Sequence, residues 1–70
     1  TNKIIMFSRK CKKSLYKSTY QKNAFTKNKI YKCVEEDENF FYFIDNEGHE
    51  FSVHKTPSKI HYWIDDYFHS

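Results

Sequence analysis

The chain has 70 residues, a formal net charge of +3, two cysteines, seven Phe, six Tyr and one Trp. This length excludes a second domain, two cysteines exclude a disulfide-rich scaffold, and the aromatic content excludes a disordered chain. No apolar run approaches the roughly 20 residues that span a bilayer, so we expect a cytoplasmic protein without membrane contact.

The modest net charge hides two strong fields of opposite sign. Residues 1–34 contain ten cations and no acid, whereas residues 35–70 contain nine acids and only two lysines. The two parts therefore carry formal charges of +10 and −7. A binding partner would meet a charged surface on either side.

The first half of the chain predicts two strands separated by a long basic loop. Residues 4–7 are apolar and predict the first strand. Residues 9–27 are polar and cationic with a few scattered aromatic residues, and they predict a long, partly ordered loop that can include a short helical turn. Residues 30–34 are β-branched and aromatic and predict the second strand.

The second half predicts a β-hairpin. An acidic turn at residues 35–39 leads into residues 40–44, the most apolar strand of the chain. Residues 45–48 predict a turn in which Gly48 takes a positive φ. Residues 49–54 alternate and predict the next strand, with Phe51 and Val53 facing inward.

The C-terminal segment allows two interpretations. Thr56 and Pro57 can open a helix, after which Ile60, Trp63, Ile64 and Tyr67 fall on one apolar stripe. The alternative is a short 3₁₀ turn followed by a last strand over residues 63–68. Asp65 and Asp66 near a helix C-terminus would oppose the helix dipole.

Residues 25–54 resemble a known type of small protein. The stretch from Phe25 to Val34, an acidic turn and the stretch from Phe41 to Gly48 are similar to small SH3-like barrel proteins of phages and low-GC Gram-positive bacteria. The resemblance implies one all-β SH3-like domain over residues 1–70. It would have five short strands, a long basic loop after the first and a short C-terminal helix or 3₁₀ turn. Asn28 stands where these proteins usually have Gly, and Asn tolerates positive φ best among the other residues.

Catalytic and cofactor chemistry has little support in the sequence. Cys11, Cys33 and the four histidines lack the short paired spacings of structural zinc sites, so we expect no metal and no cofactor. Cys33 fits a small core residue on a strand better than a nucleophile. A single glycine excludes a phosphate-cradling loop, and the paired carboxylates fit solvated turns. We therefore expect a protein that is not an enzyme.

The first function hypothesis is a protein-interaction module of a phage or mobile element that binds and modulates or inhibits a host protein. Acidic loops beside surplus aromatic side chains suit a basic partner surface. The residues expected to carry this binding are Glu36, Asp37, Phe40, Tyr42 and Trp63. The protein would be a monomer or a homodimer, because surplus aromatic residues and edge strands allow self-association.

The second hypothesis is a small nucleic-acid-binding barrel. Lysines that neutralise phosphates release counterions, and aromatic rings can stack on unpaired bases. The basic loop over residues 9–29 would carry this binding through Arg9, Lys10, Lys12, Lys13, Tyr16 and Tyr20. The acidic half of the domain would oppose a nucleic acid that wrapped around it.

Overall fold

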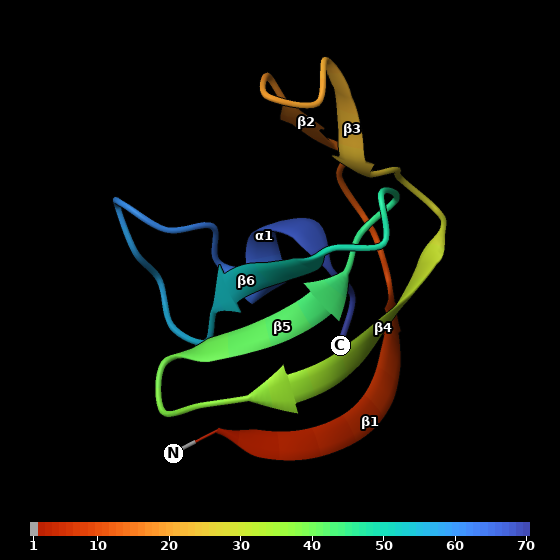
Figure 1. The fold of residues 1–70 in the computed structure, drawn as a ribbon. Coiled ribbons are helices and arrows are strands. Elements are labelled where there is room, and N and C mark those ends of the chain that lie inside the picture. Colours follow the sequence, from red (N-terminus) through yellow and green to blue (C-terminus); the bar gives the residue numbers. More distant parts are fainter. Residues whose placement is uncertain (1) are drawn as a thin grey trace.

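The structure is a computed structural model that describes residues 2–70, and it is mostly β with one short helix (Figure 1). Its six strands form two antiparallel sheets, with the order β1-β4-β5-β6 in the larger one, called here the main sheet, and β2-β3 in the smaller one. The elements are β1 (Lys3–Lys10), β2 (Leu15–Lys17), β3 (Lys22–Phe25), β4 (Ile30–Glu36), β5 (Phe40–Ile44), β6 (Glu50–His54) and α1 (Ile64–Tyr67).

The main sheet buries one face, as its sequence alternation predicts. Cross-strand pairs put Phe43 opposite both Cys33 on β4 and Phe51 on β6, and these three side chains lie in the core. The β5–β6 hairpin is therefore confirmed. Gly48 in its turn has φ 79°, as predicted, and Asn28 before β4 has φ 74°. Both positions need a residue that tolerates the left-handed region.

Aromatic rings fill the core between the sheets and the C-terminal segment. Phe43 and Phe68 stack with ring centroids 4.3 Å apart, and Phe25 meets Phe68 edge-on at 5.1 Å. All three side chains are fully or almost fully buried. Each buried ring removes roughly 150–250 Å² from water, which is how so short a chain obtains a core.

The predicted long basic loop is wrong in part, because residues 9–27 contain most of a second sheet. Leu15 and Phe25 pair across the β2–β3 hairpin, and both are buried. Gln21 takes φ 55° in the turn that joins the two strands. Apolar residues that look isolated among lysines in the sequence are thus brought together by the hairpin. The expected five strands become six, and β1 extends to Lys10 rather than ending at residue 7.

The C-terminal helix is present but shorter than Thr56 and Pro57 predict. It covers only Ile64–Tyr67, with Asp65 and Asp66 in its first turn, where carboxylates favour the dipole. The Thr56 hydroxyl lies 3.1 Å from Nδ1 of His54 instead of capping a helix. Ile60 is exposed because no core lies beside it.

The last residues touch both edges of the main sheet without forming a strand. Trp63 makes an isolated parallel bridge to His54 at the end of β6, and Phe68 makes an antiparallel bridge to Cys11 just after β1. The strand pairings among residues 2–70 leave both sheets open. Within the same residues, no helix combines the length and apolar character that crossing a membrane requires.

Candidate binding groove

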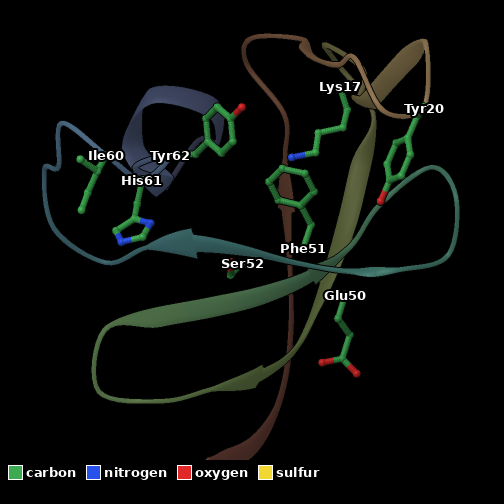
Figure 2. A pocket seen from close by; sticks show the side chains of 8 residues that line it. All are labelled: Lys17, Tyr20, Glu50, Phe51, Ser52, Ile60, His61 and Tyr62. Atoms are coloured by element: carbon green, nitrogen blue, oxygen red, sulfur yellow. The ribbon is translucent and has the colours of Figure 1, made fainter.

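A hollow in the described surface lies between the β2–β3 hairpin and residues 60–62. It encloses about 330 Å³ and is lined by Lys17, Tyr20, Glu50, Phe51, Ser52, Ile60, His61 and Tyr62. Figure 2 shows the hairpin side chains on one side, Ile60, His61 and Tyr62 on the other, and the Phe51 ring between them. We call this hollow the groove.

Three aromatic rings run in a row from the floor of the groove to α1. The Phe51 and Tyr62 centroids lie 5.6 Å apart, and those of Tyr62 and Tyr67 lie 5.7 Å apart. Phe51 is only 9% exposed, whereas Tyr62 is 39% exposed. The row therefore offers a ligand one well-supported aromatic face, that of Tyr62.

A lysine lies over each end of this row. Lys17 Nζ is 5.4 Å from the Phe51 centroid, and Lys13 Nζ is 5.3 Å from the Tyr67 centroid. Such cation–π contacts hold a lysine near a ring and leave its charge exposed to solvent on the other side. Lys17 thus lines the groove beside its aromatic floor, whereas Lys13 lies at the α1 end of the row, outside the groove lining.

The hairpin side of the groove is held in place by the turn between β5 and β6. The Tyr20 hydroxyl donates to Oδ2 of Asp45 at 3.1 Å and lies 3.1 Å from Nδ1 of His49. Desolvation raises the pKa of Tyr20, and the Asp45 hydrogen bond and the charges of Asp45 and Glu47 add to this. Tyr20 therefore stays protonated and keeps donating. The Lys22–Glu47 ion pair, at 3.1 Å, adds a second link.

Asn46 fixes the base of the hairpin through three side-chain hydrogen bonds. Its Nδ2 donates to the Asn23 carbonyl at 3.1 Å and to the Thr26 hydroxyl at 3.0 Å. Its Oδ1 accepts the Tyr31 hydroxyl at 2.8 Å. These bonds make the groove wall a preorganised surface, which lowers the entropic cost of binding.

The residues predicted to bind nucleic acid are dispersed rather than gathered. Arg9 bonds the His69 carbonyl at 3.3 Å with its guanidinium over Phe7, and Lys10 and Lys12 are exposed nearby. Tyr20 lines the groove, and Lys13 lies over Tyr67 at the α1 end of the row of rings. Tyr16 is 60% exposed, on the opposite side of β2 from Leu15.

The predicted protein-binding residues lie on both faces of the main sheet. Phe40 faces away from the core, and its ring meets His54 and His61 edge-on at 5.0 Å and 4.9 Å. His61 also lines the groove, so the Phe40 cluster and the groove are continuous. Trp63 is half-buried and packs against the core.

Two carboxylates of the acidic turn, those of Glu36 and Asp37, form bonds within the chain. Asp37 accepts hydrogen bonds from the Tyr42 hydroxyl at 2.6 Å and from the Phe40 amide at 2.7 Å. The Tyr42 hydrogen bond, followed by the backbone bonds, lowers the pKa of Asp37, and the same bond raises the pKa of Tyr42 to about 12. Glu36 pairs with Lys55 at 2.6 Å. Glu38, by contrast, is exposed and forms no ion pair among residues 2–70, so its charge is open to a partner.

The structure adds site residues that the sequence reasoning missed. Lys17, Phe51, His61, Tyr62 and Tyr67 come from four separate segments, and their convergence depends on the hairpin. The only sequence signal for them was the surplus of aromatic residues over what a small core can bury.

Cys11 and Cys33 are both free cysteines in the described part of the chain. Both thiols are buried, and desolvation raises the pKa of Cys11 and of Cys33, which keeps them protonated. Residues 2–70 contain no group of three or more His, Cys, Asp or Glu placed to hold a metal ion. Comparisons with protein-family models, with curated proteins and with solved structures each found no match.

Proposed function

We propose that this protein is a non-catalytic interaction module whose groove binds an extended segment of a partner protein. The observation that carries the proposal is the exposed Tyr62 ring, supported by Phe51 and Tyr67, with a lysine over each end of the row. Aromatic rings held by neighbouring rings are typical anchors of protein interfaces. The lysines favour a segment that carries both an apolar side chain and a carboxylate.

We also propose that the domain is a variant of the SH3-like type. Two observations support this. The main sheet has the order β1-β4-β5-β6, and the C-terminal segment meets both of its edges through Trp63 and Phe68. The resemblance to phage and low-GC bacterial proteins makes a protein of the bacterial host, bound in its cytoplasm and modulated or inhibited by this domain, the expected partner.

A single-stranded nucleic acid is the second candidate ligand. The lysines beside Tyr62 favour it, because one ring could stack on a base while Lys13 and Lys17 meet phosphates. Asp45 and Glu47, at the Tyr20 end of the groove, oppose it because they would repel a phosphate backbone. A protein segment meets both ends of the groove with fewer unfavourable contacts.

A matched pair of variants tests the proposal. Ligands would be selected from a displayed library of random peptides, and their affinities measured by calorimetry. Tyr62→Ala should weaken the selected peptides about tenfold or more, whereas Tyr16→Ala, at a more exposed tyrosine outside the groove, should not. Equal losses for both variants would contradict the proposal.

The same variants distinguish the nucleic-acid alternative. Fluorescence anisotropy with a labelled oligothymidylate would be recorded over a range of salt concentrations. Binding that falls steeply with salt and is lost in Lys13→Glu and Lys17→Glu would favour nucleic acid. We expect weak binding to the oligonucleotide that does not depend on Tyr62.

A further inference from the structure

Strand β1 has one edge that the rest of the described chain covers only at its C-terminal end. It is an edge strand of the main sheet and pairs only with β4. Figure 1 shows it along the lower border of the sheet with no element beyond it. The C-terminal segment reaches only its last residue, where the His69 amide donates to the Lys10 carbonyl at 2.9 Å.

The backbone of this edge is able to form a new strand pairing. The Cys11 amide and carbonyl bond to Lys29 and Asn28, on the β4 side of the chain. Successive residues of a strand direct their backbone groups to alternate sides, so those of Lys10 and Ser8 face the free edge. Among residues 2–70, no bond to the Ser8 backbone comes from outside the main sheet. Its amide and carbonyl are therefore ready to pair with an added strand.

Side chains along the same edge offer apolar contacts on both faces of an added strand. Ile4 and Met6 are 83% and 67% exposed on the outer face. Ile5 and Phe7 are half-buried and pack against the core from the other face. A strand laid along β1 would cover part of each pair, and exposed apolar residues on a sheet edge are typical of surfaces that bind other chains.

The charges of β1 select the kind of strand that can be added. The strand carries Lys3, Arg9 and Lys10 and no acid. Antiparallel pairing of two copies over the full strand would place Lys3 opposite Lys10 or Arg9, and like charges directly opposite each other are unfavourable. The irregularity between Ile4 and Phe7 further hinders self-pairing. The same three cations would attract an acidic strand.

We propose that the free edge of β1 accepts an extended acidic segment of a different protein, which adds a strand to the main sheet. The end of this edge already accepts a paired segment. The Lys12 amide donates to the Tyr67 carbonyl at 2.7 Å, and with the His69–Lys10 bond this makes the C-terminal segment antiparallel to β1. This site is separate from the groove and does not depend on the proposed function.

The test uses the full chain labelled with ¹⁵N and an eight-residue peptide of alternating glutamate and valine. We expect saturable amide shifts along β1 and slower hydrogen exchange of the Ser8 amide on binding. The matched peptide with lysine in place of glutamate should cause neither change. Shifts confined to Phe51, Tyr62 and their neighbours, or no shifts at all, would overturn the proposal.

Changes to the edge provide the second part of the test. Ser8→Pro removes the outward amide and should abolish the shifts, and Lys10→Glu should weaken binding about threefold to fivefold. Lys59→Glu, on the exposed segment after β6, is the charge control and should bind as the parent does. If Ser8→Pro does not fold, N-methylation of alternate peptide amides should abolish binding to the unchanged protein.

A measurement of self-association shows whether the free edge of β1 binds a different protein or pairs with a second copy of this chain. Sedimentation of the protein alone should show a monomer. A dimer that dissociates when Ser8 is replaced by proline would show that the edge pairs with another copy and would overturn the assignment to an acidic partner.

Discussion

Phe43 on β5 and Phe68 after α1 stack almost parallel, with ring centroids 4.3 Å apart and an interplanar angle of 7°. This contact joins the centre of the main sheet to the last residues of the chain. Phe68 also meets Phe25 of the hairpin, so one ring holds three parts of the fold together. The C-terminal segment is thus a structural part of the core.

The first prediction concerns this ring. Phe68→Ala should lower the free energy of unfolding by about 3–5 kcal/mol, because it removes a fully buried ring and leaves a cavity. Urea denaturation followed by tryptophan fluorescence measures the change. The matched control is Tyr62→Ala, a partly exposed ring, which should cost clearly less. Similar losses in the two variants would show that the C-terminal segment contributes little to the core.

The second prediction concerns Asp37 and acid stability. Its pKa is lowered by the Tyr42 hydroxyl first and by the Asn39 and Phe40 amides next. Because the folded-state pKa lies below the unfolded value, the stabilisation is present above the unfolded pKa and is lost as the pH falls through the folded one. Asp37→Asn should therefore reduce the loss of stability on acidification, as measured by urea denaturation at several pH values. The same acid dependence in parent and variant would contradict this role.

The third prediction concerns the partner in that bond. The pKa of Tyr42 is raised to about 12, mainly by the hydrogen bond to Asp37. Because the folded-state pKa lies above the unfolded value near 10, the stabilisation is present below pH 10 and is lost as the pH rises toward 12. NMR titration of the tyrosine rings should show Tyr42 ionising late. In Asp37→Asn its pKa should move back toward 10, and an unchanged value would contradict the assigned cause.

The fourth prediction concerns the attachment of the hairpin. Asn46→Ala removes the bonds to Asn23, Thr26 and Tyr31 and should cost about 1–3 kcal/mol, because three side-chain hydrogen bonds are lost together and the one to Tyr31 is partly buried. Hydrogen exchange in β3 should become faster than in β5. Asn39→Ala is the control, at an exposed asparagine that forms hydrogen bonds only through its backbone among residues 2–70. Uniform acceleration over the whole chain would indicate general destabilisation instead.

The fifth prediction concerns Asn28, which has φ 74°. Asn28→Ala should cost about 1 kcal/mol, because an alanine Cβ is strained in the left-handed region. Asn28→Gly should stay within about 0.5 kcal/mol of the parent, since glycine loses strain but gains unfolded-state entropy. Thermal unfolding measures both. If the alanine variant is as stable as the glycine variant, the positive φ of Asn28 does not restrict which residue is tolerated there.

Local patterns were enough to predict part of the fold. The alternation of Phe51 and Val53, the apolar run of β5 and the turn at Gly48 gave the β5–β6 hairpin correctly. Asn28 was correctly expected to take a positive φ. Each of these features depends on residues close together in the sequence, so propensity and periodicity suffice to predict them.

The hairpin β2–β3 could not be predicted in the same way. Its strands have three and four residues, which is too short to show a clear alternation of apolar and polar residues. Leu15 and Phe25 are buried because the main sheet and Phe68 provide the core against which they pack. The prediction that the C-terminal helix begins at Thr56 and Pro57 was wrong for a related reason. Residues 55–62 form a mostly exposed loop that returns to the end of β6, where the His54 amide donates to the Tyr62 carbonyl, so the helix begins only at Ile64, the next residue that is buried in the core.

The sequence by itself determined that this is a small aromatic-rich β domain with cations in its first half and acids in its second. These properties depend only on composition and on the alternation of neighbouring residues, both of which can be read directly from the sequence. Only the tertiary structure decided which rings and lysines meet. The groove joins β2, the hairpin turn, β6 and residues 60–62, and the free edge of β1 depends on where the C-terminal segment ends its pairing. Contacts between segments distant in sequence arise from packing around a shared core, which no local pattern encodes.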